Sequence, residues 1–357
     1  MKILIDIGHP AHVHYFRYFI QKMKLNGCQF LIFARDKEVT YTLLNKYGVQ
    51  FRSRGKGKNS LFGKLIYLLK ADLKLLSASL RWKPDLFMSF GSPYAAHAAF
   101  LTGKPHVGLT DTEHAKLGIL SFAPFTNTII TPESFYKSFG RKQVRFNGFF
   151  ELCYLHPKYF KADKSIRNYL KLGEHDKFVL LRFISWKASH DIGQAGITYG
   201  NKIKLLELLT NHGYKVFISA EGDLPPELER HRIKISPEQV HDVLAEADLF
   251  VGESGTMATE AAILGTPSVY VNSLDAGVFR DEVKYGLLYS FRSDENIYSF
   301  VNELIDDDQL KQKHRESRVK MLAEKIDVTE FLTWFIENYP DSKRIMSENP
   351  DYQNNFL

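Results

Sequence analysis

The 357-residue sequence is poor in cysteine and contains no long apolar run. Cys28 and Cys153 are its only cysteines, which excludes a disulfide framework or a cysteine-rich zinc cluster and indicates a reducing compartment. No apolar stretch reaches the roughly 18 residues that span a bilayer. The start of the chain lacks the pattern of a signal peptide. We therefore expect a cytoplasmic protein, with peripheral contact at the inner face of the cell membrane as an option.

The sequence also lacks internal repeats, low-complexity segments and a recognisable nucleic-acid-binding motif. Its formal net charge of +6 suits anionic partners such as phosphorylated sugars, anionic lipid or nucleic acid. An ordinary solvated surface explains the same charge. Because the motif is missing, we expect no nucleic-acid partner.

Short apolar strands alternate with helix-like segments in two successive series. The first series runs from "KILIDI" to "VRFNGF", and the second begins at "FVLLRFI". Near-continuous apolar strands separated by helices are typical of a parallel sheet covered on both faces. We predict an α/β protein with two Rossmann-like domains, residues 1–155 and 165–324, and a frayed tail over 346–357.

The segment "GESGTMATEAAILGTPSV" places a turn between a strand and a helix, where unpaired N–H groups and a partial positive charge favour phosphate. Gly255 allows a ligand to approach the backbone, and Ser254 and Thr256 can cap the helix or donate to phosphate oxygens. Glu260 can accept both hydroxyls of a ribose. The alternative is a well-capped buried helix with a surface glutamate.

This segment resembles the nucleotide-binding segment of GT-B-fold enzymes, in the branch of UDP-N-acetylglucosamine 2-epimerases and MurG-like glycosyltransferases. Five positions of that motif are matched, by Ser254, Gly255, Glu260, Gly265 and Pro267. Thr256 replaces the usual second glycine. The segments "IDIGHPAHVHYF", "TDTEHA" and "RFISWKASHDIG" resemble more closely a bacterial and archaeal family of unknown function in the same superfamily, over roughly residues 1 to 320.

The resemblance implies a GT-B-like pair of domains whose parallel sheets face an interdomain cleft. The carboxyl-terminal domain would hold the nucleotide and the amino-terminal domain the acceptor or sugar. Part of 325–345 would cross back to the first domain. No metal or further cofactor is expected beyond a nucleotide-sugar donor, a UDP-sugar first, because helix N-termini and basic side chains neutralise the diphosphate.

A polar loop, "RFISWKASHDIG", follows the first strand of the second series. The resemblance implies a histidine and basic residues near the diphosphate, and His190, Lys187 and Ser185 are the candidates. His190 with Asp191 can also form an acid–base element. Trp186 can stack on a ligand or simply pack. Alternatively, the loop only caps the sheet.

Two further clusters follow strands of the first series. In "GLTDTEHAKLG", Asp111, Glu113 and His114 can supply a general base or a substrate contact. The alternative is helix capping by Asp111 and its neighbours. In "SFGSPYAAHAA", Gly91 and Ser92 stand where 2-epimerases carry a catalytic aspartate in a Gly-Asp-Thr turn. This departure disfavours epimerase chemistry, and leaves Ser92 to bind a substrate hydroxyl or cap a helix.

The opening loop "GHPAHVH" places three histidines directly after the first strand. Gly8, His9 and His12 are candidates for substrate binding or acid–base chemistry in the first domain. If His14 is helical, its side chain points about 200° away from that of His12, so the three are not expected to share a metal. His14 is then a core or capping residue.

The segment "RSRGKGKNSLFGKLIYLLKADLKLLSASLRWK" has a basic lead and a leucine-rich helix with lysines and an arginine on one side. A core-facing helix with a solvated lysine stripe is the simpler interpretation. A helix lying on an anionic membrane is the alternative, and it suits a lipid-linked acceptor.

The combined prediction is a metal-independent, sugar-nucleotide-dependent glycosyltransferase of surface-polysaccharide or glycoconjugate synthesis, acting on an acceptor glycan or lipid-linked acceptor. A 2-epimerase-like enzyme and a non-catalytic nucleotide- or nucleic-acid-binding protein are the alternatives. The catalytic candidates are His9, His12, Asp111, Glu113 and His190. The nucleotide-binding candidates are Ser185, Lys187, Ser254, Gly255, Thr256 and Glu260. The substrate-binding candidates are Gly8, Gly91, Ser92, His114, Trp186, Asp191 and Glu253.

Overall fold

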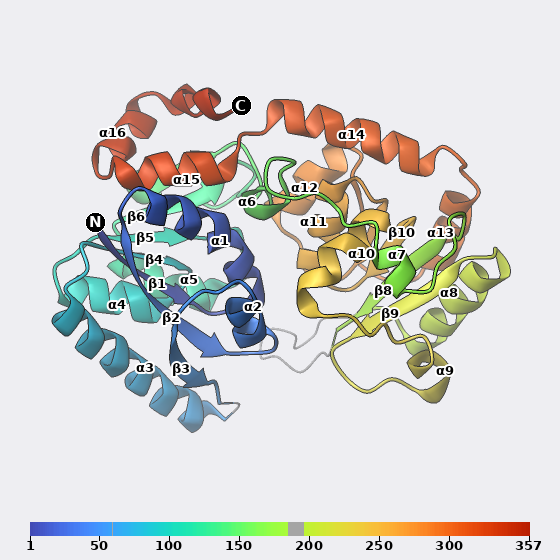
Figure 1. Cartoon of the computed structure of the whole chain (residues 1–357), viewed down its shortest axis with the longest axis horizontal. Coiled ribbons are helices and arrows are strands. Elements are labelled where there is room, and N and C mark those ends of the chain that lie inside the picture. Colours follow the sequence, from blue (N-terminus) through green and yellow to red (C-terminus); the bar gives the residue numbers. More distant parts are fainter. Residues whose placement is uncertain (59, 185–195) are drawn as a thin grey trace. The chain divides into compact units, whose positions relative to one another are not determined.

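The computed structural model describes residues 1–58, 60–184 and 196–357. Its contacts divide the chain into unit 1, Met1–Tyr159 with Lys325–Leu357, and unit 2, Phe160–Glu324 (Figure 1). Each unit contains one sheet whose paired strands all run parallel. The predicted α/β class, with two Rossmann-like folds in one chain, is confirmed.

The sheet of unit 1 has seven strands in the order β3-β2-β1-β4-β5-β6-β7. The strands are β1 (Lys2–Ile7), β2 (Gln29–Asp36), β3 (Arg52–Lys56), β4 (Leu86–Phe90), β5 (His106–Leu109), β6 (Thr128–Pro132) and β7 (Gln143–Phe146). The sheet grows in one direction from β1 to β3 and in the other from β4 onward. In such sheets ligands bind beyond the carboxyl ends of the strands at this reversal, here between β1 and β4.

Helices cover both faces of this sheet (Figure 1). One face carries α1 (Pro10–Leu25), α2 (Thr40–Lys46), α6 (Leu152–Leu155) and α15 (Val328–Glu337). The other carries α3 (Leu61–Trp82), α4 (Pro93–Leu101), α5 (Lys116–Phe122) and the short helix η1 (Ala123–Phe125). Unit 1 also contains η2 (Gly140–Lys142), α16 (Asp341–Glu348) and η4 (Pro350–Phe356). The central strand β1 is buried on both sides, which explains its unbroken apolar run.

The sheet of unit 2 has five strands in the order β12-β11-β10-β8-β9. The strands are β8 (Phe178–Phe183), β9 (Lys215–Ala220), β10 (Leu249–Gly252), β11 (Ser268–Val271) and β12 (Leu288–Phe291). The helices are α7 (Ile166–Tyr169), α8 (Tyr199–Asn211), α9 (Pro226–Glu229), η3 (Pro237–Gln239), α10 (Val240–Glu246), α11 (Gly255–Leu264), α12 (Gly277–Lys284), α13 (Ile297–Ile305) and α14 (Leu310–Glu324). This order reverses between β8 and β10, which is the switch point of unit 2.

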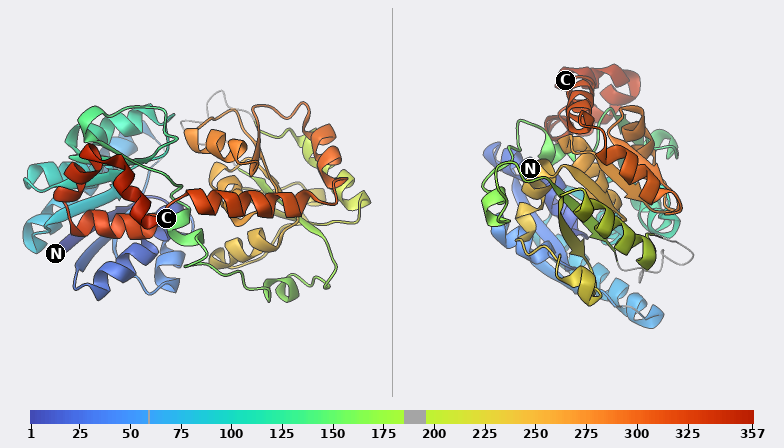
Figure 2. Two further views of the ribbon diagram at one scale, coloured as in Figure 1. Left: turned by 90° about the horizontal axis from the view of Figure 1, so that it is seen from above. Right: turned by 90° about the vertical axis from the view of Figure 1, so that its right-hand side faces the viewer.

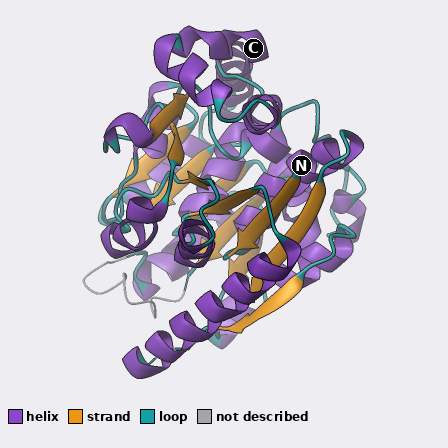
Figure 3. Cartoon of the chain, turned by 90° about the vertical axis from the view of Figure 1, so that its left-hand side faces the viewer, coloured by secondary structure: helices purple, strands orange, loops and turns teal. Residues whose placement is uncertain are grey.

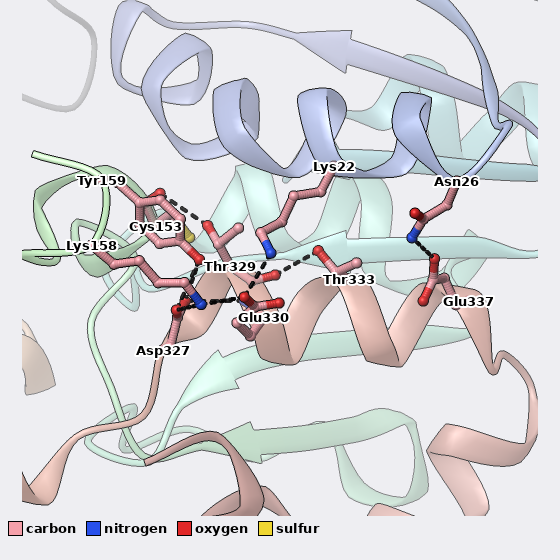
Figure 4. Close-up of polar contacts among 10 residues, drawn as sticks. All are labelled: Lys22, Asn26, Cys153, Lys158, Tyr159, Asp327, Thr329, Glu330, Thr333 and Glu337. Carbon is pink, nitrogen blue, oxygen red and sulfur yellow. Dashed lines mark hydrogen bonds and ion pairs between the residues drawn. The ribbon is translucent and has the colours of Figure 1, made fainter.

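The end of the chain returns to unit 1, where ion pairs fix α15 against α1 (Figure 4). Lys22 Nζ lies 2.6 Å from Glu330 Oε1, and Lys158 contacts the same carboxylate. Asp327 caps α15 by accepting the Glu330 N–H at 3.1 Å and also accepts the Tyr159 hydroxyl at 2.8 Å. This network ties three separate segments of unit 1 together.

The predicted frayed tail over 346–357 is wrong, because this segment is anchored on unit 1. The Gln353 side chain accepts the Asn147 N–H at 2.6 Å and donates to Glu133 at 3.0 Å. The ring of Tyr352 stacks on Trp334 with their centroids 4.6 Å apart. The polar composition of the tail concealed these contacts, which depend on partners far away in the sequence.

Within the described residues, no helix combines the length and the apolar character needed to cross a bilayer.

Candidate functional site

A buried polar cluster fills the switch point of unit 1. Asp6, the penultimate residue of β1, is fully buried, and its Oδ2 accepts a hydrogen bond from the Ser92 hydroxyl after β4. Arg54 Nη1 lies 3.1 Å from the same oxygen, and its guanidinium lies 4.2 Å from the centre of the Tyr94 ring. Burial raises the pKa of the Asp6 carboxyl, whereas Arg54 and Ser92 act to lower it. The ends of β1 and β4 are thus joined by a charge-assisted hydrogen bond.

A β-bulge directs Arg54 into this cluster. The pairing of β2 with β3 shifts between Ala34 and Arg35, so Arg54 is the extra residue on β3. Gly55, which follows it, has a φ of 91°, a conformation that favours glycine. Bulges re-aim side chains, and here the guanidinium crosses β2 to reach Asp6 on β1.

His9, the N-cap of α1, and His12, in the first turn of that helix, are held as hydrogen-bond donors. The Ala11 N–H donates to His9 Nδ1 at 3.2 Å, and the Gly8 N–H donates to His12 Nδ1 at 3.3 Å. Burial lowers the pKa of His9 to about 4 and that of His12 well below its ordinary value. Both rings are therefore neutral near pH 7, and the hydrogen bonds to Nδ1 assign the proton to Nε2. Each Nε2–H can donate to a ligand oxygen, but neither ring can act as a base through that atom.

The turn between β1 and α1 gathers other groups around Gly8. A Cβ at Gly8 would lie 3.6 Å from Arg54 Nη2 and 3.8 Å from His12 Cε1, so both side chains line this turn. His14 points elsewhere: it is buried and stacks on Tyr154, with ring centroids 5.0 Å apart, as predicted for a core residue. Over residues 1–58, 60–184 and 196–357, no group of three or more potential metal ligands converges.

The turn after β5 contributes a carboxyl, that of Asp111, which can exchange a proton near neutral pH. Burial raises the pKa of Asp111 to about 6, while the Thr112 hydroxyl, which donates to Asp111 at 2.8 Å, acts to lower it. Taken as a whole residue, Asp111 is half-buried. Glu113, by contrast, is fully buried and accepts the Tyr136 N–H at 3.3 Å, which is a structural position rather than the predicted catalytic one.

The remaining predicted residues of unit 1 divide between turn and packing positions. Gly91 has a φ of 60° and lets the chain turn from β4 into α4. Ser92 stands at the N-cap of α4 but makes no capping bond, because its hydroxyl is committed to Asp6. His114 is half-buried and precedes α5, whose N-cap position is occupied by Ala115. Capping of α5 is therefore not the role of Asp111.

At the switch point of unit 2, Glu253 binds the backbone rather than a substrate. Its carboxylate is fully buried, and it accepts the N–H groups of Ile184 at 2.8 Å and Ile197 at 2.7 Å. Lys202 Nζ lies 3.3 Å from it. These contacts join β10 to the residues on either side of 185–195. The predicted substrate contact is corrected, because both carboxylate oxygens are already used by the protein.

The N-terminus of α11 is accessible. Ser254 caps it by accepting the Met257 N–H at 3.5 Å, and Ser254, Gly255 and Thr256 are all half-exposed. A Cβ at Gly255 would lie 2.7 Å from Phe279 Cζ. A larger residue here would displace the Phe279 ring, a constraint that the sequence does not reveal.

Glu260 lies on the buried side of α11. It is 4% exposed, and its Oε1 lies 3.0 Å from His241 Nε2 of α10. The alternative of a surface glutamate is therefore wrong, because Glu260 is part of a buried pair. A ribose can reach this carboxylate only if the pair opens.

Five predicted residues, Ser185, Trp186, Lys187, His190 and Asp191, lie outside the described part of the chain. The site also contains Asp6, Arg54 and His241, which are not among the residues predicted from the sequence. A charge inside the apolar run "KILIDI" is a usable signal for Asp6. Arg54 and His241 carry none, because one depends on a bulge and the other on contact with a distant helix.

Comparison with known proteins identifies relatives and similar folds. The chain is 26% identical over 281 residues to the uncharacterized protein MJ0665 of Methanocaldococcus jannaschii, covering 75% of this chain and 81% of that relative. The UDP-GlcNAc 2-epimerase of Neisseria meningitidis, solved bound to UDP-GlcNAc, matches with a TM-score of 0.64 at 13% identity, over 98% of this chain and 99% of the other. The glycosyltransferase VinC, solved with dTDP, matches with a TM-score of 0.62 at 12% identity, over 94% and 99%.

These likenesses show a GT-B fold shared with sugar-nucleotide epimerases and glycosyltransferases. The profile of the family described as "Protein of unknown function (DUF354)" matches residues 1–330, and the chain therefore belongs to the DUF354 family.

Proposed function

We propose that this protein is a glycosyltransferase that uses a nucleotide-sugar donor, a UDP-sugar first, in the synthesis of a surface polysaccharide or glycoconjugate. Unit 2 binds the donor and unit 1 the acceptor, a glycan or a lipid-linked sugar. The helix N-terminus neutralises the diphosphate, so the proposal requires no metal.

The observation that carries the proposal is the accessible N-terminus of α11 at the carboxyl edge of the sheet of unit 2. Ser254, Gly255 and Thr256 are half-exposed there, next to the switch point between β8 and β10. A helix N-terminus at this position presents backbone N–H groups and hydroxyls to a phosphate. The neighbours of known structure that carry UDP-GlcNAc or dTDP support a nucleotide as the ligand.

Asp111 is the proposed base in unit 1. With a pKa of about 6, its carboxylate is ionised at neutral pH yet is a stronger base than an ordinary aspartate. It takes the proton of the acceptor hydroxyl as the new bond forms between that oxygen and the anomeric carbon. The bond from that carbon to the donor phosphate breaks, and the nucleoside diphosphate leaves. His9 and His12 donate from Nε2 to acceptor oxygens.

An epimerase is the less favoured alternative. The turn after β4 contains Gly91, Ser92 and Pro93 and no carboxylate. Asp6, which contacts this turn through Ser92, is fully buried and is also paired with Arg54. The described residues around this turn therefore provide no exposed carboxylate for proton abstraction from a sugar carbon.

The test begins with binding. UDP, dTDP, GDP and CMP are compared by thermal unfolding of the full chain, with and without EDTA. A nucleotide at about 100 times its Kd should stabilise the fold by about 2.7 kcal/mol. Thr256→Glu places an acid at the start of α11, where it favours the helix but repels phosphate, and should abolish the shift. Val319→Glu on α14, at an exposed position, is the control with equal charge.

Chemistry is then followed with the sugar conjugate of the nucleotide that binds. In the absence of an acceptor, water can replace it, and a transferase should then release the nucleoside diphosphate slowly. Loss of this release in Asp111→Asn would support the transferase. If NMR instead detects a sugar nucleotide epimerised at C2 in the absence of any acceptor, the protein is an epimerase and the transferase proposal is wrong. If no nucleotide shifts the melt, the proposed donor site is refuted.

A further inference from the structure

Helix α3 of unit 1 presents a stripe of leucines to solvent. Leu65, Leu69, Leu73 and Leu80 are 55%, 54%, 66% and 60% exposed. Leu65, Leu69 and Leu73 are four residues apart, and Leu80 follows seven residues, or about two turns, later. All four side chains therefore form a row on one face of the helix. The opposite face, with Leu75 fully buried, packs on the unit's own core. The simpler interpretation of α3, a core-facing helix whose outer side is a lysine stripe, does not explain this row.

The N-terminal half of α3 extends past the strands of its sheet (Figures 2 and 3). Leu65 and Leu69 lie in this half and are exposed. The neighbouring helix α4 packs against α3 on the same face of the sheet. This helix also ends in two exposed apolar residues, Phe100 and Leu101, each 63% exposed.

Basic side chains flank the leucine row. Lys64, Lys70 and Arg81 of α3 are exposed. The single acidic residue of the helix is Asp72, and its carboxylate lies 3.1 Å from His97 Nδ1 of α4. The outward side of α3 therefore combines apolar and cationic groups, and its one acid is paired with a neighbour.

We propose that α3 docks this protein on an anionic membrane surface, with the leucine row in the apolar boundary and the cations on lipid phosphates. An amphipathic helix with leucines beside lysine and arginine is the type that lies in the plane of an anionic interface. A second copy of the chain fits this surface less well, because pairing α3 with α3 brings cations of like sign together. The inference goes beyond the proposed function, since nucleotide binding in unit 2 does not depend on it.

The test is co-sedimentation of the full chain with phosphatidylcholine vesicles that contain or lack phosphatidylglycerol. Binding should require phosphatidylglycerol and weaken as salt is raised. Leu69→Glu with Leu73→Glu should abolish it. Leu25→Glu with Val319→Glu places the same two charges at exposed apolar positions outside α3, which are 86% and 66% exposed, and should bind as the parent does.

The cationic part is tested at one position. Lys70→Gln should weaken binding about fivefold, the equivalent of about 1 kcal/mol for one cation at the surface. Lys320→Gln, at an exposed position on α14, is its control and should change binding less.

Three outcomes overturn the proposal: no sedimentation with either vesicle, equal loss in both pairs of glutamate variants, or a dimer in light scattering that the α3 variants convert to monomer. The stabilisation of the α3 variants by nucleotide, measured by thermal unfolding, distinguishes this proposal from the proposed function. It should equal that of the parent whatever the vesicle experiment shows.

Discussion

The switch points of the two sheets are built in opposite ways. In unit 1 the position between β1 and β4 is closed by side chains, through the buried bond between Asp6 and Ser92 and the approach of Arg54. In unit 2 the position between β8 and β10 is held by one carboxylate, Glu253, bound to backbone N–H groups. The N-terminus of α11 next to it stays accessible.

The difference separates two kinds of recognition. Unit 2 offers backbone and hydroxyl groups, which suit a phosphate common to many nucleotides. Unit 1 offers perturbed titratable groups, with a pKa of about 6 at Asp111 and about 4 at His9. Such groups gather where protons move or where a particular substrate must be positioned. Under the proposed function, unit 2 would bind the group that many nucleotides share, and unit 1 would supply the chemistry.

The largest effect should come from opening the cluster in unit 1. Asp6→Asn removes the negative charge beside the buried guanidinium of Arg54 while preserving the shape of the side chain. Breaking a buried ion pair from one side costs about 3–5 kcal/mol, because the other charge is left uncompensated. Urea denaturation of the full chain measures the loss.

The double variant Asp6→Asn with Arg54→Met separates the charge from the packing. Removing both partners should recover a large part of the lost stability. If the double variant is as unstable as the sum of the two single ones, the pair is not coupled and the cluster is not the electrostatic unit described above.

The next largest loss of stability should come from Glu253 in unit 2. Glu253→Gln leaves one oxygen to serve two buried N–H groups and removes the charge beside Lys202. We expect a loss of about 2–3 kcal/mol. Hydrogen exchange should accelerate at the amides of Ile184 and Ile197 in particular. Glu221→Gln, at an exposed carboxylate of the same unit, should change stability by less than about 0.5 kcal/mol and leave both amides protected.

The fold follows from local pattern to a large extent. The apolar run of β1 and the helix that begins at Pro10 can be read directly, because each depends on period, burial and turn residues. The two αβ series also predict two parallel sheets. The tail was misjudged because the contacts of Gln353 and Tyr352 are made with residues more than a hundred positions away or on another helix.

The candidate site follows from sequence only in part. The sequence predicts where the turns after the strands lie, because strand ends identify them. It does not predict the role of each side chain within a turn, because that role depends on the residues that the fold brings near the side chain. Gly255 faces Phe279, Glu260 faces His241, and neither neighbour is implied by the motif itself.

A smaller change in stability should come from Asp111, the carboxyl of unit 1 whose pKa is raised to about 6. In the folded chain Asp111 keeps its proton up to about pH 6, whereas the unfolded carboxyl releases it near 3.8. The folded state holds more protons between these values, so the contribution of Asp111 to stability falls as pH rises through this window and stays low above it. Asp111→Asn should therefore stabilise the chain by about 1–2 kcal/mol at neutral pH and have little effect near pH 3.8.

Chemical denaturation at several pH values measures this difference. Asp36→Asn, at an exposed carboxyl of the same unit, is the control for the change in net charge. A gain from Asp111→Asn that is equal at all pH values would mean that the carboxyl is not the group with the raised pKa.

The smallest effect compares the two helix caps at the switch points, His9 on α1 and Ser254 on α11. Asparagine is a good cap at either place, so His9→Asn and Ser254→Asn should each stay within about 0.5 kcal/mol of the parent at neutral pH. The pKa of His9 is lowered from 6.5 to about 4 in the folded chain, so its contribution is complete above 6.5 and is lost as pH falls towards 4. Between about pH 7 and about pH 5, the parent should lose about 1 kcal/mol relative to His9→Asn. The difference between the parent and Ser254→Asn should stay constant over the same range, because a hydroxyl does not titrate there. If stability changes with pH by the same amount relative to both variants, the cap of α1 is no more sensitive to protons than the cap of α11. The helix caps would then give no support to the contrast between the two switch points.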